Sequence, residues 1–372
     1  MTKNALKDNN LLINVLNKSL SLSQLNLRHW DMILRQARQS HVISILANRL
    51  SKDELNCLPD RVKLHFEIQN QVSIRHLSAI NWEIQCILDA LKTVNQPLVL
   101  LKGAAYAISD LPVSRGRLFS DVDILVPFNQ IEKVEKAFVK FGWVSTKLEA
   151  YDQMYYRKWM HELPPMTHEK RGTALDVHHN ILPLTAKKPV DSSKLLSEKV
   201  PISGYENVYV LQPVDMVLHS MTHLFHEGEM DHGLRDLLDL DSLINYFSHK
   251  EKNFWDKLLQ RSEELNLQLP LYYGLRYPHK ILKTPVPNDV LTKTNKFLPK
   301  FPRLMDFIFT RGFRPNHRSC DDSYSVFAKW LIYVRSHYLR MPFYLLIPHL
   351  IRKAYVRRTA KIESEANNQQ QA

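Results

Sequence analysis

Two aspartates stand two residues apart in an apolar stretch, Ser120–Val126, that predicts a β-strand. Side chains at positions i and i+2 of a strand lie on the same face, about 7 Å apart along the chain. Two carboxylates on one face of an apolar strand repel each other and lose hydration, and a divalent cation between them removes both problems. Carboxylates with open coordination positions suit Mg²⁺, which keeps several waters and accepts substrate phosphates. We therefore expect Asp121 and Asp123 to be metal ligands and catalytic residues.

A third aspartate, Asp176, lies in the stretch Thr173–Ile181, which predicts a later strand. Its neighbours Leu175 and Val177 are apolar, as expected for a central strand, so Asp176 and His178 should face the same side. A buried aspartate that caps the preceding hairpin is the alternative interpretation. The residues alone leave the role of Asp176 open.

The segment before the acidic strand suits the binding of phosphate. The apolar run Leu98–Leu101 predicts a buried strand, which ends at Lys102-Gly103-Ala104, where a helix can begin. Backbone N–H groups at a helix start suit phosphate oxygens, and glycine lets the backbone approach closely. Lys102 and Arg117 can neutralise the charge of a triphosphate, or they can be ordinary surface residues.

In the order of its motifs, the chain resembles the polymerase-β-like nucleotidyltransferases. These motifs are LLKGAA, Arg117, SDVDILV and LDVHHN, then a helical H-x(3)-H-x(2)-H followed by LRDLLDL. In particular, residues 58–247 resemble a poorly characterised bacterial nucleotidyltransferase family. The resemblance implies transfer of a nucleoside monophosphate from an NTP, such as ATP, to a hydroxyl acceptor, with release of pyrophosphate. It also implies that two Mg²⁺ ions are held by Asp121, Asp123 and Asp176, the last being the later-strand carboxylate of the superfamily.

The glycine turn departs from the superfamily pattern. Many members carry Gly-Ser where this chain has Gly103-Ala104. The hydroxyl contact to phosphate is therefore absent or is supplied by Ser120. Arg117 also matches a family position. We expect the nucleotide to be bound by Lys102, Gly103, Ala104, Arg117 and Ser120.

The composition and the order of elements predict an α+β protein. The chain has 372 residues, 44% of them hydrophobic, and only 9 glycines, which argues against Rossmann or P-loop architecture and favours a helix-rich fold. We expect a small mixed β-sheet core over residues 96–211. Helical regions flank it at residues 1–95, with a long helix over Leu58–Thr93, and at residues 212–365, which is basic; residues 366–372 form a disordered tail.

Further strands are predicted at Trp143–Lys147 and Gln153–Trp159. Met166–Lys170 should form another, joined to Thr173–Ile181 through the turn Arg171-Gly172.

Three histidines, His219, His223 and His226, share one face of a helix predicted over Val214–His226. They suit a nucleotide-contacting face, or a transition-metal site with Glu227, Glu229 or Asp231, although an HExxH motif is absent. His178 and His179 are expected to be ordinary histidines at a sheet surface. Asp239 lies at a recurring acidic position of the family, and a salt bridge to Arg235 is its plain explanation.

The positive charge is concentrated towards the C-terminus. Residues 290–361 hold 15 Lys and Arg but only three Asp, so this segment accounts for the net charge of +12. Such a segment attracts RNA, nucleotides or an anionic membrane surface, unless it is a solvated basic face. Residues 341–358, MPFYLLIPHLIRKAYVRR, could lie in a membrane interface, bind RNA, or pack on the protein body.

The remaining features favour a cytoplasmic protein that could contact the inner membrane peripherally. No signal-peptide core or membrane-spanning apolar run is present, and three distant cysteines give no disulfide or zinc spacing. Three functions stay open. They are transfer to a small molecule, sugar, peptide or protein; toxin-like modification of tRNA; and a non-catalytic scaffold that binds nucleic acid or a membrane surface.

Overall fold

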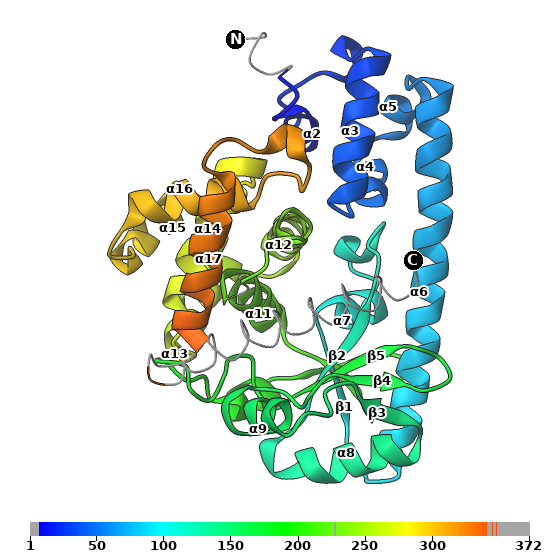
Figure 1. The fold of residues 1–372 in the computed structure, drawn as a ribbon, viewed down its shortest axis with the longest axis vertical. Coiled ribbons are helices and arrows are strands. Elements are labelled where there is room, and N and C mark those ends of the chain that lie inside the picture. Colours follow the sequence, from blue (N-terminus) through cyan, green and yellow to red (C-terminus); the bar gives the residue numbers. More distant parts are fainter. Residues whose placement is uncertain (1–6, 227, 341–343, 345–346, 348–372) are drawn as a thin grey trace, which may run out of the picture.

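The computed structural model describes residues 7–226 and 228–340, together with residues 344 and 347 (Figure 1). A seven-stranded mixed sheet lies towards one end of the molecule and the N-terminal helices lie at the other, so the predicted α+β class is confirmed. The helices before the sheet are α2 (Leu11–Leu16), α3 (Leu27–Gln39), α4 (Ile43–Arg49), α5 (Lys52–Asn56) and α6 (Asp60–Lys92).

The long helix α6 connects the two ends of the molecule (Figure 1). Its bounds confirm the helix predicted over Leu58–Thr93. Ile80, Ile84, Ile87 and Leu91, which follow helical spacing, are all buried. This half of α6 packs on β1, α7 and α8, so the apolar stripe attaches the helix to the sheet.

The sheet has the strand order β3-β4-β5-β2-β1-β7-β6, with β2 at its centre. Its two central neighbours are β1, antiparallel to β2, and β5, parallel to it. The predicted strands around the acidic motif and the Arg171-Gly172 hairpin are confirmed, whereas β6 was not predicted. The strands are β1 (Leu98–Leu101), β2 (Asp121–Leu125), β3 (Trp143–Ser145), β4 (Met166–His168), β5 (Ala174–His178), β6 (Val200–Pro201) and β7 (Val208–Val210).

The strand register places the acidic residues side by side. Asp123 of β2 pairs with Asp176 of β5, and on the other side it pairs with Leu101 of β1. Helix α7 (Lys102–Ile108) begins directly after Leu101, so Lys102 starts beside Asp123. The register thus brings three separate sequence motifs to one edge of the sheet.

The strand predicted over Gln153–Trp159 is wrong, because these residues belong to helix α9 (Ala150–Trp159). Tyr151, Tyr155 and Trp159 follow one another at intervals of four, and the rings of the two tyrosines each contact Trp159 edge-on. Asp152 in the first turn and the basic residues of the last turn also complement the helix dipole. The aromatic residues suggested a strand by composition, but their spacing is helical.

Helix α11 is the centre of the C-terminal half, where it packs on α7, α12, α13, α14 and α17. On its histidine-bearing face, His219 is buried, whereas His223 and His226 are partly exposed. The remaining helices are α8 (Ile131–Lys140), α10 (Ser192–Ser197), α11 (Pro213–His226), α12 (Gly233–Lys250), α13 (Phe254–Glu264), α14 (Gln268–Tyr277), α15 (Asn288–Thr294), α16 (Pro302–Gly312) and α17 (Ser325–Arg340).

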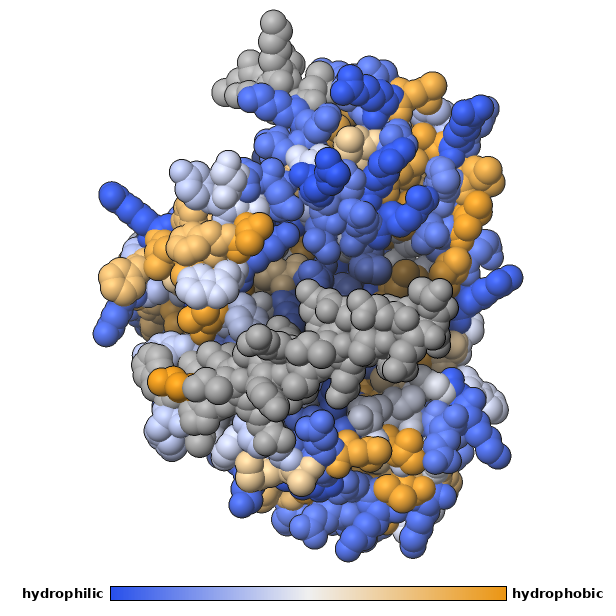
Figure 2. All heavy atoms as spheres, viewed as in Figure 1, coloured by the Kyte–Doolittle hydropathy of each residue, from blue (hydrophilic) through white to orange (hydrophobic). Residues whose placement is uncertain are grey.

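Helix α17 lies within the basic segment 290–361 and directly precedes residues 341–358. Phe327 and Trp330 are exposed and stack on each other, while Arg335 donates a hydrogen bond to the carbonyl of Phe225. Figure 2 shows a mostly hydrophilic face, with apolar side chains gathered near α15 and α16 and along the upper part of α6. Apart from residues 344 and 347, the segment 341–358 lies outside the described residues, as does the tail 366–372. Within the described chain, no helix has the length and apolar character needed to cross a membrane.

An ion pair between the buried Glu83 and the more exposed Arg171 ties α6 to the hairpin that carries Asp176. Glu83 of α6 is 3% exposed and accepts two hydrogen bonds from the Arg171 guanidinium, at 2.9 and 2.7 Å, and one from Thr173 at 3.1 Å. The Arg171 guanidinium also lies over the Trp143 ring, 4.8 Å from its centroid. These contacts fix the turn from which β5 starts.

Replacing Glu83 by Gln should therefore lower the free energy of unfolding by about 2 kcal/mol, because it weakens charge-assisted hydrogen bonds in a buried place. Urea unfolding followed by circular dichroism measures this change. Glu67→Gln, on an exposed position of the same helix, is the matched control and should stay within about 0.5 kcal/mol of the parent. Equal changes in the free energy of unfolding for the two variants would contradict the stabilising role of the ion pair between Glu83 and Arg171.

Candidate active site

The three predicted carboxylates converge. Oxygen atoms of Asp121, Asp123 and Asp176 all lie within 4.8 Å of one another. Asp123 is buried, at 4% exposure, whereas the other two side chains are partly exposed. Three hard oxygen donors with accessible edges fit Mg²⁺, which needs further positions for water and phosphate oxygens. The donor set therefore agrees with the metal that the resemblance implies.

Lys102 and His178 stabilise Asp123, the buried carboxylate of the three. Lys102 Nζ lies 2.8 Å from Asp123 Oδ1, and His178 Nε2 lies 2.9 Å from the same oxygen. Lys102 adopts a left-handed backbone conformation, φ 44°, at the point where β1 ends. Strained backbone of this kind is typical of functional sites. The structure thus places Lys102 against Asp123 rather than on the protein surface.

The pKa values of the two adjacent aspartates are driven apart. Burial favours the neutral form of Asp123, but Lys102 and His178 hold its pKa well below its ordinary value. For Asp176, burial and the negative charges of Asp123 and Glu162 raise the pKa to about 7. Two carboxylates with different protonation near neutral pH suit acid–base work beside a metal.

Gly103 is required for close packing of the turn. A side chain at this position would collide with Nη1 of Arg117. The guanidinium of Arg117 also lies near the rings of Tyr106 and Phe119, 5.9 and 5.5 Å from their centroids. Ala104 is buried in the same helix. The turn therefore serves as the support on which Arg117 is packed.

Asp239 is the partner of Arg117, so the salt bridge predicted between Asp239 and Arg235 is wrong. Arg117 Nε lies 2.8 Å from Asp239 Oδ2, and both side chains are buried. Arg235 instead pairs with Asp236, at 2.9 Å. Helical spacing alone favoured the local pair, but burial of Arg117 requires a buried anion, which α12 supplies.

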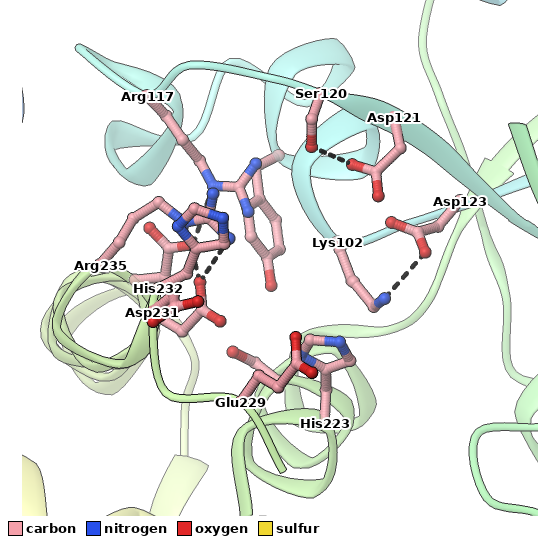
Figure 3. Close-up of a pocket in the computed structure, with 14 residues that line it drawn as sticks. Lys102, Arg117, Ser120, Asp121, Asp123, His223, Glu229, Asp231, His232 and Arg235 are labelled. Atoms are coloured by element: carbon pink, nitrogen blue, oxygen red, sulfur yellow. Dashed lines mark hydrogen bonds and ion pairs between the residues drawn. The ribbon is translucent and has the colours of Figure 1, made fainter. Parts of the chain in front are cut away.

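Two cavities meet at the carboxylates. The first, of about 380 Å³, lies between the acidic strand and the α11–α12 connection (Figure 3), and the second, of about 280 Å³, lies on the β5 side. Lys102, Asp121 and His223 line both cavities. Ser120, Asp123 and Arg117 belong to the first cavity and Asp176 belongs to the second. In Figure 3 the Lys102 side chain points towards Asp123, and Ser120 bonds to Asp121, with a donor–acceptor distance of 2.8 Å.

The histidines of α11 line the second cavity. His219, His223 and His226 all lie on its wall, and His223 reaches the first cavity as well. Burial lowers the pKa of His219 to about 3 and that of His226 to about 4, so both are neutral at physiological pH. They therefore contribute polar, uncharged groups to the wall.

Sequence reasoning missed two residues of this wall, His161 and Glu162. They lie in the segment between α9 and β4, shortly after the residues that were predicted as a strand but form a helix. A polar pair between the apolar Met160 and Leu163 was the available signal.

A family model described as "Uncharacterised nucleotidyltransferase" matches residues 26–283. The match covers more than half of the chain, includes all three carboxylates, and confirms the resemblance drawn from the ordered motifs. It extends beyond residues 58–247 in both directions. No curated protein and no solved structure matches the chain.

Binding of Mg²⁺ should weaken about tenfold between pH 8 and pH 6. Asp176 carries a proton below a pKa of about 7, and a metal ion must displace that proton to use the carboxylate. Isothermal titration calorimetry with Mg²⁺ at the two pH values measures the change. Asp176→Asn should bind Mg²⁺ more weakly and with a smaller pH dependence, whereas equal affinity of the parent at both pH values would contradict a role for Asp176 in binding the ion.

Proposed function

The chain belongs to a family of uncharacterised nucleotidyltransferases, and from that premise we propose that it transfers a nucleoside monophosphate from an NTP to a hydroxyl acceptor, with release of pyrophosphate, in a Mg²⁺-dependent reaction. The observation that carries the proposal is the convergence of Asp121, Asp123 and Asp176 where two cavities meet. A transferase of this kind needs room for two substrates on either side of its catalytic groups.

Asp121, Asp123 and Asp176 would hold the metal. When bound there, two Mg²⁺ ions would neutralise phosphate charge and make the acceptor hydroxyl more acidic. Asp176 faces the second cavity, and its carboxylate would accept the proton that the acceptor hydroxyl loses. His178 and Lys102 would keep Asp123 ionised until the metal binds, as their contacts to its Oδ1 support.

We assign the nucleotide to the first cavity. Lys102, Arg117 and Arg235 line it and supply positive charge, and Ser120 supplies a hydroxyl group. Gly103 and Ala104 do not line it, so in this proposal their backbone shapes the turn that positions Lys102. ATP is one candidate among the NTPs, since the lining residues give no reason to prefer a particular base.

We assign the acceptor to the second cavity, where it would meet Asp176. A volume of about 280 Å³ admits a small molecule, or the end of a sugar, peptide, protein or RNA chain. The basic C-terminal third would suit an RNA acceptor or a membrane surface. We place the reaction in the cytoplasm, where NTPs and Mg²⁺ are plentiful.

The test is incubation of the full chain and Mg²⁺ with each α-³²P-labelled NTP and separate RNA, protein, small-molecule and cell-envelope fractions. We expect the label to enter one fraction, with release of pyrophosphate. Asp121→Asn with Asp123→Asn should lower the rate at least about 100-fold, because even changes behind metal ligands cost 10–100-fold. Asp256→Asn, at a 78% exposed side chain on α13, is the matched control and should leave the rate unchanged.

Each outcome decides between the functions. Label in RNA alone would favour the tRNA-modifying reaction, and label in another fraction would identify a different acceptor class. Unchanged NTP consumption in the double variant would refute the role given to the two aspartates. No incorporation in any fraction, together with binding to RNA or anionic vesicles, would favour a non-catalytic scaffold.

A further inference from the structure

A second group of potential metal ligands lies on the wall of the second cavity. One ligand atom from each of His161, Glu162 and His178 lies within 4.8 Å of the others. None of the three carboxylates of the active site belongs to this group. The two imidazoles and one carboxylate form a different donor set from the all-oxygen set beside them.

The backbone holds these three residues in place. Glu162 forms a β-bridge with His178, Leu163 N donates to the carbonyl of Val177 at 2.9 Å, and His179 N donates to that of His161 at 2.8 Å. The segment before β4 thus pairs with the end of β5. A group presented by paired backbone suits metal binding better than one on an unsupported loop.

His178 already has the orientation of a metal ligand. Its Nε2 hydrogen-bonds to Asp123 Oδ1 at 2.9 Å, which leaves Nδ1 facing Glu162, 3.2 Å from Oε2. Histidines that bind metals generally donate their second ring N–H to a carboxylate, which fixes the ring. Asp123 performs that role here, although the sequence suggested only an ordinary histidine.

His161 supplies an independent observation. Its Nδ1 is buried, and it forms no hydrogen bond to any described residue. A buried polar atom without a partner requires an explanation. The ring lies 5.3 Å from that of His178, centroid to centroid, and a nitrogen of each ring lies within 4.8 Å of the other, so one ion could bind to both.

We propose that His161, Glu162 and His178 bind a transition-metal ion, for which Zn²⁺ is the best match. Two imidazoles and a carboxylate suit Zn²⁺, and three protein ligands leave a position open. The open position would face the second cavity and take an oxygen atom of the molecule held there. The histidines of α11 lie on the same cavity wall, but within the described chain no metal-ligand group includes them. Zn²⁺ binding itself does not require nucleotidyl transfer, whereas the identity of the molecule at the open position rests on the proposed acceptor site.

The test measures binding by the full chain after removal of metals with EDTA. Asp121→Asn with Asp176→Asn removes carboxylates of the Mg²⁺ site but leaves Asp123, which orients His178. We expect this double variant to bind one Zn²⁺ per chain in calorimetry and to give visible absorption bands with Co²⁺, typical of nitrogen ligation. Adding His161→Ala should lower the Zn²⁺ affinity at least about tenfold.

Two further variants complete the design. His226→Ala removes a histidine from the same cavity wall but outside the group, and should retain Zn²⁺ binding. Glu162→Gln preserves the shape of a partly exposed side chain, and it decides the question if His161→Ala does not fold. Zn²⁺ affinity unchanged by the folded ligand variant, or absent from the double aspartate variant, would overturn the proposal.

Discussion

The pairing of Asp123 with Asp176 on adjacent parallel strands is the constraint on which the site depends. The register of β2 and β5 places two acidic side chains next to each other in a mostly buried part of the sheet. A slip of one residue would turn one of them to the opposite face. Two ionised carboxylates at these positions destabilise the fold unless other groups compensate, because like charges repel and burial disfavours the ionised form of each. Lys102 and His178, which share Asp123 Oδ1, supply the compensation.

The compensation is asymmetric, and this asymmetry gives the two aspartates different chemistry. Asp123 receives both contacts and stays ionised, while Asp176 sits beside that negative charge and has a pKa of about 7. The surrounding helices keep both aspartates away from solvent, which the two pKa shifts require. The clamp from Glu83 to Arg171 fixes the hairpin of β5, and the buried pair of Arg117 and Asp239 joins the turn after β1 to α12.

The sequence was most informative where a local period shows which side chains share one face of a strand or helix. Alternation along a strand placed Asp121 and Asp123 on one face, and the long helix predicted over Leu58–Thr93 is α6. It was least informative where partners are distant in the chain. The partner of Arg117 stands 122 residues away, so helical spacing selected Arg235 for Asp239 instead. Asp176 could be assigned only through the family resemblance, because no spacing rule connects β2 with β5. His161 and Glu162 gave no periodic signal, since their position depends on pairing with the end of β5.

The contacts of Lys102 reconcile its two roles. In the structure the ammonium group neutralises Asp123, whereas the resemblance assigns Lys102 to the triphosphate. The side chain lines the first cavity, to which we assign the nucleotide, as well as the second. Asp123 is one of the residues that would hold Mg²⁺, and the bound ion would supply the charge that neutralises this carboxylate. Lys102 would then be free to contact phosphate in the first cavity, where a cation on a flexible stem is well suited. One lysine can thus stabilise the buried carboxylate before the ion binds and the phosphate charge afterwards.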